Sequence, residues 1–209
     1  MKSITLPKIY PITNAELSGL SHAEQVKQMT EAGSTFIQLR EKAATSRDLY
    51  CEAVEAITVA RQSGVALIIN DRVDIALAID ADGVHLGQDD LDPVIARQIF
   101  GKDKIIGYST HSLEQVREAM TKPVDYIAFG PIFPTSTKAD HNPVVGLQMI
   151  RTVKDLIGEM PLVVIGGINR SNILDVLAAG ADSAAIISDV FISGQSIGDN
   201  LAKIITAAG

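Results

Sequence analysis

Residues 124–138 read Val-Asp-Tyr-Ile-Ala-Phe-Gly-Pro-Ile-Phe-Pro-Thr-Ser-Thr-Lys. A short apolar run, Tyr126–Phe129, follows an aspartate and ends at a glycine that opens a loop with two prolines, three hydroxyls and a lysine. The apolar run predicts a buried strand, and the prolines fix the backbone of the loop that follows it. Threonine and lysine side chains supply hydrogen-bond donors suited to a phosphate or pyrophosphate. The stretch therefore predicts a strand with an anion-binding loop at its carboxyl end.

The same unit, a β-branched or apolar run followed by an amphipathic segment, recurs along the chain. Short joints containing Asp82, Asp125 and Asp182 precede three of the runs. Serine caps at Ser21, Ser46 and Ser112, and the start at Ser171, predict helix beginnings, and Gly33, Gly64, Gly101 and Gly180 predict helix ends. The predicted strands are Ile9–Ile12, Phe36–Arg40, Ala66–Asn70, Gly83–Leu86, Ile105–Ser109, Tyr126–Phe129, Leu162–Ile165 and Ala184–Ile187.

Strands that alternate with helices predict a parallel sheet with right-handed crossovers. Eight such units in 209 residues favour an α/β fold of one domain, 1–209, built as a (β/α)8 TIM barrel. A doubly wound open sheet with fewer strands is the alternative, because strand counts are hard to fix from one sequence.

The composition excludes several functions. The chain is 46% hydrophobic and 21% charged, as expected of a globular protein with a core, and its net charge of -7 argues against nucleic-acid binding. Small anionic substrates remain compatible because they respond to the local field. No signal peptide or membrane span is evident, which predicts a cytoplasmic protein that does not bind membranes. The single cysteine, Cys51, is expected to be an inert packing residue in a helix.

Polar residues cluster at the predicted carboxyl ends of strands two to four. Period-two alternation places Gln38, Arg40 and Lys42 on the face that points into the barrel, where two cations would require an anion. Asp71 and Asp90 follow neighbouring strands and could approach each other. Each could instead be a simple helix cap. Two facing carboxylates are a usual way to hold Mg²⁺ together with a substrate phosphate.

A second anion site is predicted after strands seven and eight. Gly166 and Gly167 allow close approach of a ligand to the backbone, and Ile187 and Ser188 follow the next strand. The loops after these strands are the usual phosphate site of the barrel. His85 points inward and is interpreted as a hydrogen-bonded residue of the barrel layer rather than a proton-transfer group.

These motifs together resemble the thiamine phosphate synthase family, in order and over almost the whole chain. The residues that carry the resemblance are Gln38–Lys42, Asn70–Arg72, Gly83–Asp90, Gly107–Ser109, Gly130–Lys138, Ile165–Ile168 and Ile187–Ser188. The resemblance implies a Mg²⁺-dependent transferase in thiamine biosynthesis. Its reaction condenses hydroxymethylpyrimidine pyrophosphate with a thiazole phosphate, or the carboxylate of that phosphate, to give thiamine phosphate and pyrophosphate.

The resemblance also implies residue roles. Asp71 and Asp90 would hold Mg²⁺. The pyrimidine pyrophosphate would contact Gln38, Arg40, Lys42, Asn70, Ser109 and Lys138, of which Arg40, Lys42, Ser109 and Lys138 are expected to be catalytic. The thiazole phosphate would contact Thr135, Thr137, Gly167, Ile187 and Ser188.

Three features of the predicted enzyme remain open. The loop of residues 131–146 is a candidate lid. A thiazole tautomerase-like relative and a catalytically silent barrel that senses thiamine phosphates are the alternative functions. The oligomeric state, including a homo-oligomer, is not decided by the sequence.

Overall fold

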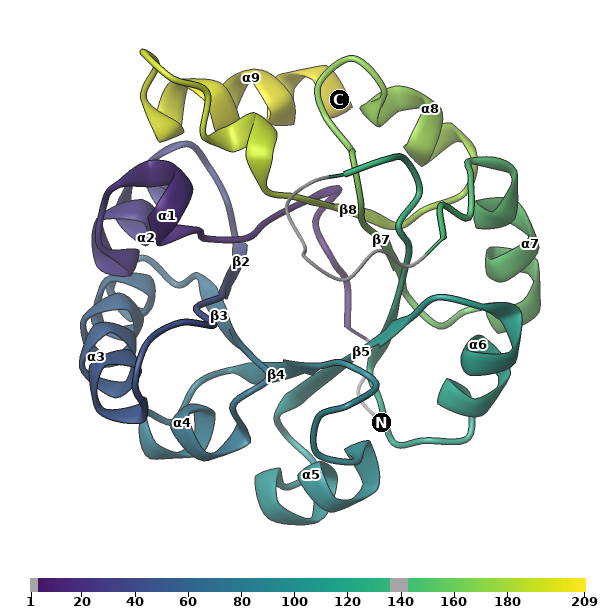
Figure 1. Cartoon of the computed structure of the whole chain (residues 1–209), viewed down its shortest axis with the longest axis horizontal. Coiled ribbons are helices and arrows are strands. Elements are labelled where there is room, and N and C mark those ends of the chain that lie inside the picture. Colours follow the sequence, from purple (N-terminus) through teal and green to yellow (C-terminus); the bar gives the residue numbers. More distant parts are fainter. Residues whose placement is uncertain (1–3, 136–142) are drawn as a thin grey trace.

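The computed structural model describes residues 4–135 and 143–209. Its parallel strands form a ring that is surrounded by helices (Figure 1). The strands are β1 (Ile9–Pro11), β2 (Phe36–Leu39), β3 (Ala66–Asn70), β4 (Gly83–Leu86), β5 (Ile105–Thr110), β6 (Tyr126–Phe129), β7 (Leu162–Val164) and β8 (Ser183–Ile186).

The strand order closes the sheet on itself. Each strand from β2 to β8 pairs with its neighbour in the chain, and β1 pairs with β8. Between β1 and β2 the contact is one bridge, Ile12 to Gln38, with a hydrogen bond of 2.9 Å from the Thr13 N–H to the Gln38 carbonyl. The sheet is thus a nearly closed (β/α)8 barrel, which confirms the predicted fold and excludes the open doubly wound sheet.

Helices cover the outside of the ring, and most of their predicted beginnings are confirmed. Ser21 and Ser112 accept hydrogen bonds at the starts of α2 and α6. The predicted cap at Ser46 is wrong, because Thr45 accepts from the Asp48 N–H and Ser46 is already helical. The helices are α1 (Ala15–Ser18), α2 (His22–Glu31), α3 (Ser46–Gln62), α4 (Val73–Ala78), α5 (Pro93–Phe100), α6 (Leu113–Ala119), α7 (Gln148–Ile157), α8 (Ile173–Ala178), the 3-10 helix η1 (Ser188–Val190) and α9 (Ile197–Ala208).

The recurring aspartates in the sequence have one shared structural role. Asp82, Asp125 and Asp182 each stand directly before an even-numbered strand, β4, β6 or β8. Their carboxylates accept from the N–H groups of Leu67, Ile106 and Leu162 on the preceding odd-numbered strand, at 2.9, 2.8 and 2.7 Å. Each aspartate therefore ties two neighbouring strands together at their amino ends.

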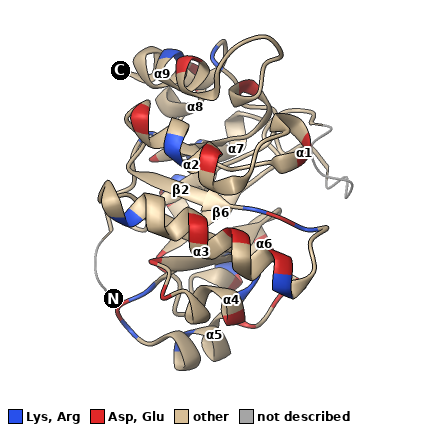
Figure 2. Ribbon diagram, turned by 90° about the vertical axis from the view of Figure 1, so that its left-hand side faces the viewer, with Lys and Arg blue, Asp and Glu red and all other residues tan. Residues whose placement is uncertain are grey.

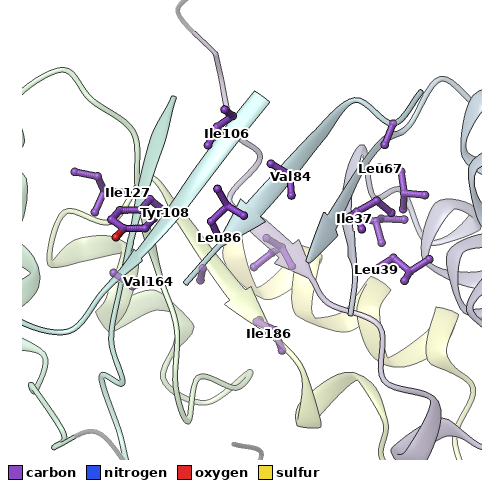
Figure 3. Packing of buried hydrophobic residues seen from close by; sticks show 14 of the residues in the cluster. Ile37, Leu39, Leu67, Val84, Leu86, Ile106, Tyr108, Ile127, Val164 and Ile186 are labelled. Atoms are coloured by element: carbon purple, nitrogen blue, oxygen red, sulfur yellow. The ribbon is translucent and has the colours of Figure 1, made fainter. Parts of the chain in front are cut away.

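Strand residues alternate between two apolar layers. Those that point outward pack against the helices, and Figure 3 shows members of this layer such as Ile37, Leu67 and Val84. The inward layer fills the barrel and contains the rings of Tyr10, Phe36 and Tyr126, which meet edge to face. Because the interior is packed, open space for a ligand is left at the ends of the barrel, not along its axis.

The outer surface mixes charges of both signs. Figure 2 shows acidic and basic residues side by side on the helix α3. The prediction that Cys51 is a packing residue is wrong, because this free cysteine is exposed on α3. Within residues 4–135 and 143–209, no helix has the length and apolar character needed to span a membrane.

Candidate active site

The carboxyl end of β2 supplies a buried amide and two cations. Gln38 is 2% exposed and points into the barrel. The strand ends at Leu39, one residue earlier than predicted, so Arg40 and Lys42 belong to the following loop. The Arg40 backbone N–H donates to the Thr13 hydroxyl (3.1 Å). This bond ties the start of the loop to the end of β1.

Asp71 has an uncommon backbone conformation that presents its carboxylate to Lys42. Its φ of 61° lies in the left-handed region, which few residues other than glycine adopt, and its N–H donates to the His85 carbonyl (2.8 Å). The Lys42 Nζ lies 3.3 Å from Asp71 Oδ2. Asp71 is not a helix cap, because the residue at the cap of α4 is Arg72. Backbone outliers of this kind concentrate at functional sites.

Asp90 lies in the loop that follows β4, and its side chain is beside that of Asp71. It accepts from the Gly87 N–H (2.7 Å), while Asp92 caps α5. The helix-cap alternative is therefore wrong for both carboxylates. Burial, together with a hydrogen bond and charge repulsion from Asp71, raises the pKa of Asp90 to about 6. A partly buried carboxylate beside a second carboxylate favours its protonated form unless a cation lies close to it.

Two further polar groups face the same end of the barrel. Asn70 is 8% exposed, and its side-chain nitrogen has no hydrogen-bond partner in the described structure. A buried donor left unpaired is costly and is expected to find a ligand. Ser109, at the end of β5, is buried, and its hydroxyl lies 2.8 Å from His85 Nε2. His85 is therefore a hydrogen-bonded residue of the barrel layer, as the sequence predicted.

The loop after β6 packs against the glycine pair after β7. The N–H groups of Ile132 and Phe133 donate to the carbonyls of Ile165 and Gly166 (2.9 and 3.0 Å). Gly166 and Gly167 have φ values of 104° and 64°, and a Cβ on either would clash with the loop at residues 131–134. These glycines are needed both for their conformation and for the close approach of the two loops.

The end of β8 borders an open cavity of about 560 Å³. Ser188 lines it, and Ile187, the residue before, is buried. The other lining residues are Asn169, Arg170, Ser171, Asp189 and Ile192. Arg170 is bound to Asp189 (Nε to Oδ2, 3.1 Å), so its charge is partly neutralised inside the protein. Ser188 and Gly167 thus come from the two neighbouring strands predicted to hold a phosphate.

The predicted site residues gather at one end of the barrel, as far as the structure describes them. Thr135 is half-buried in the first part of the loop after β6. Thr137 and Lys138 lie outside the described residues, as does the middle of the candidate lid, residues 136–142. Sequence reasoning missed Tyr10 and Tyr126, whose hydroxyls lie 3.1 Å apart inside the barrel, close below the site. Both look like ordinary apolar strand residues in the sequence.

A parallel eight-stranded barrel with carboxylates, cations and a glycine-lined loop at its carboxyl end defines a (β/α)8-barrel enzyme for phosphorylated small molecules. A family model described as thiamine monophosphate synthase matches residues 9–190. The chain belongs to this family.

Individual relatives agree. The thiamine-phosphate synthase of Chloroflexus aurantiacus is 44% identical over 184 residues, covering 88% of this chain and 84% of the relative. That of Syntrophomonas wolfei is 46% identical over 181 residues, covering 86% of each. A solved thiamine phosphate pyrophosphorylase from Pyrococcus furiosus superposes with a TM-score of 0.87 at 35% identity, over 96% of this chain and 95% of that one. The predicted family, the transferase class and the thiamine-phosphate synthase function are thereby confirmed.

Proposed function

We propose that this chain condenses hydroxymethylpyrimidine pyrophosphate with a thiazole phosphate, or the carboxylate of that phosphate, at the carboxyl end of its barrel. The observation that carries the proposal is the Asp71–Asp90 pair with Lys42 beside it. Two carboxylates and a cation at one point form a site for a metal ion and a pyrophosphate together. The reaction is taken to be cytoplasmic and to use free small molecules.

The residues present fit Mg²⁺. Magnesium is usually held by one or two carboxylates plus waters and substrate phosphates, not by a full set of protein ligands. The described part of the chain contains no group of three or more acidic, histidine or cysteine residues able to hold a metal. The pair of Asp71 and Asp90 therefore suits an ion that shares its coordination with the substrate. The pKa of Asp90 is raised mainly by burial and further by Asp71, which supports the same assignment, since a nearby cation would favour the charged carboxylate.

In the proposed mechanism, pyrophosphate leaves the pyrimidine first, and the thiazole nitrogen then attacks the carbocation that remains. Mg²⁺, when bound, supplies charge stabilisation to the leaving group. Arg40, Lys42 and Lys138 neutralise the charge that develops on the pyrophosphate, and the side-chain nitrogen of Asn70 offers an unused donor. No protein nucleophile is required.

The proposed thiazole site lies on the opposite side of the same end. Gly167 and Ser188 offer backbone and hydroxyl groups to the phosphate, next to Ile187, and the loop with Thr135 and Thr137 completes the site. The packing of residues 131–134 on Gly166 and Gly167 supports this division. The lysine at 138 would then reach the pyrophosphate from the same loop.

The test is to incubate the protein with both substrates, with and without Mg²⁺, and to measure pyrophosphate. Release that needs the metal and both substrates is expected. Conversion of the thiazole without the pyrimidine would instead identify a tautomerase-like relative. Binding of both compounds without turnover would identify a sensor barrel, and either result would overturn the proposal.

A further inference from the structure

A chain of side-chain hydrogen bonds crosses the interior of the barrel and joins two proposed substrate contacts. It begins at Gln38 on β2, whose Nε2 lies 2.9 Å from the Tyr10 hydroxyl on β1. The Tyr10 and Tyr126 hydroxyls are 3.1 Å apart, and Tyr126 Oη is 2.9 Å from His85 Nδ1. His85 Nε2 then lies 2.8 Å from the Ser109 hydroxyl on β5. Five strands of the ring in Figure 1 contribute one residue each.

All five side chains are buried, so water does not compete freely for these bonds. Exposure ranges from 0% at Tyr126 to 9% at Ser109. Burial raises the pKa of both tyrosines well above the ordinary value, which keeps the two hydroxyls protonated. Each tyrosine hydroxyl therefore has one hydrogen, which it can donate to only one of its two neighbours.

The hydrogen bond at the Gln38 end fixes which group donates and which accepts in every later bond of the network. The amide nitrogen of Gln38 can only donate, so the Tyr10 oxygen accepts from it, and the Tyr126 oxygen is then the acceptor within the network for the Tyr10 hydrogen. The Tyr126 hydrogen then goes to His85 Nδ1. In a neutral imidazole the other ring nitrogen must carry the hydrogen. His85 Nε2 consequently donates to the Ser109 oxygen, and the Ser109 hydrogen has no acceptor among the five side chains of this hydrogen-bond network.

We propose that Tyr10, Tyr126 and His85 are positioning residues. The two tyrosines hold His85 in its Nε2–H form, and His85 in turn leaves the Ser109 hydroxyl free to donate its hydrogen to the substrate. The inference rests on the proposed function, in which Gln38 and Ser109 contact the pyrimidine pyrophosphate. The group that Ser109 meets must then be a hydrogen-bond acceptor, such as a ring nitrogen or a phosphate oxygen. In this proposal the positioning residues act on the substrate through Ser109 and not by direct contact.

The direction of the chain can be measured without substrate. The protein has four histidines, and ¹⁵N NMR of histidine-labelled protein reports which ring nitrogen carries the hydrogen in each. The His85 signals are assigned by their loss in His85→Asn. The Nε2–H form is expected for His85 in the native protein. The Nδ1–H form would mean that the chain runs the opposite way, and it would overturn the proposal.

Two matched variants remove one hydroxyl each and keep the aromatic ring. Tyr126→Phe removes the donor to Nδ1, so His85 should lose its Nε2–H preference and the KM for the pyrimidine pyrophosphate should rise about three- to tenfold, the equivalent of one hydrogen bond. Tyr10→Phe leaves the Tyr126 hydroxyl in place but removes the bond that connects it to Gln38 and so fixes its direction. The Nε2–H preference of His85 should therefore weaken in this variant too, but less than in Tyr126→Phe.

A double-variant comparison separates positioning from a general loss of packing. If Tyr126 acts through Ser109, the KM of Tyr126→Phe combined with Ser109→Ala should equal that of Ser109→Ala alone. Additive effects, or an unchanged His85 form and KM in Tyr126→Phe, would contradict the inference. A native protein that releases no pyrophosphate would instead refute the proposed function, and the NMR result would still decide the direction of the chain.

Discussion

The aromatic ring of Tyr126 occupies the space that any side chain at Gly107 would need, because a Cβ built on Gly107 would overlap the tyrosine ring. Gly107 lies on β5 beside Tyr126 on β6, and the two are paired in register. The absence of a side chain on β5 at this position thus leaves room for the ring of Tyr126, one of the two tyrosines that fill the barrel interior. The position of the Tyr126 hydroxyl depends on this arrangement.

Replacement of Gly107 by alanine should therefore destabilise the protein. Overpacking of a well-packed core costs typically 1–3 kcal/mol, occasionally more, so a clear fall in the thermal midpoint is expected. Gly198→Ala is the matched control, since a Cβ there meets only the Gln28 carbonyl at 3.4 Å and lies within α9. The control should be neutral or slightly stabilising. Equal midpoints for the two variants would contradict this account of the barrel interior.

Substitutions at Asp71 can separate its charge from its backbone conformation. Asp71→Asn keeps a residue that tolerates the left-handed region, whereas Asp71→Ala adds a strain of roughly 1–2 kcal/mol. Both should lose metal-dependent turnover, by at least about a hundredfold, because a carboxylate ligand is gone. Only the alanine variant should also lose stability in denaturant unfolding. Unchanged turnover in Asp71→Asn would remove the metal assignment.

Asp90 should make the metal-free protein less stable at high pH. Its folded pKa of about 6 lies above the ordinary value of 3.8, so the fold favours the protonated form. The stabilisation is therefore present below pH 4 and is lost as the pH rises through about 6. Asp90→Asn should unfold at a higher temperature than the native protein at pH 8, with a smaller difference at pH 4.

The same titration should appear in metal binding. Mg²⁺ requires the ionised carboxylate, so its apparent affinity should rise between pH 5 and pH 7 and then level off. Calorimetric titration at several pH values measures this, and Asp90→Asn should show weak binding at every pH. A native affinity that does not change over this range would contradict the pKa assignment.

His22 should contribute to acid sensitivity. It is fully buried, with Nδ1 2.7 Å from the Thr13 hydroxyl and Nε2 facing Glu41 and Glu52 at 3.6 and 3.4 Å. Burial lowers its pKa below the ordinary 6.5 despite these carboxylates. The fold favours the neutral ring, so stability is present above pH 6.5 and is lost as the pH falls below it.

His22→Gln should remove this part of the acid transition. Unfolding free energies measured between pH 7.5 and 5 should fall less steeply for the variant than for the native protein. The variant will be less stable at pH 7.5, because the bond to Thr13 is altered, so the slopes are compared and not the absolute values. Parallel curves would show that other groups carry the acid sensitivity.

The fold could be predicted because each strand leaves a local signal. Short apolar runs between capped helices gave all eight strands, and Asp82, Asp125 and Asp182 marked three of them. The errors in the predicted strands lie at the strand ends. Arg40 and Ile187 continue an apolar or alternating pattern, yet the ladder stops before them and they enter loops. Strand ends depend on the partner strand, which one sequence does not reveal.

The proposed site was predictable where its residues follow strands, and not where they meet inside the barrel. Asp71 and Asp90 were expected to approach each other because neighbouring strands end together. The link from Tyr10 to Tyr126 joins positions 116 residues apart. A tyrosine in an apolar run gives no sign of where its hydroxyl will point, so only the closed barrel reveals the chain of hydrogen bonds.

The aspartate ties described above join β3 to β4, β5 to β6 and β7 to β8, and the corresponding pair of β1 and β2 lacks one. Thr35 stands directly before β2, in the place that aspartate takes before the other even-numbered strands. The junction between β1 and β2 has the bridge from Ile12 to Gln38 and the bond from the Thr13 N–H to the Gln38 carbonyl. We call this junction the seam. Arg40 is fastened at that seam, through its N–H to the Thr13 hydroxyl. Opening of the seam would therefore displace a proposed pyrophosphate contact, which links the integrity of the barrel wall to substrate binding.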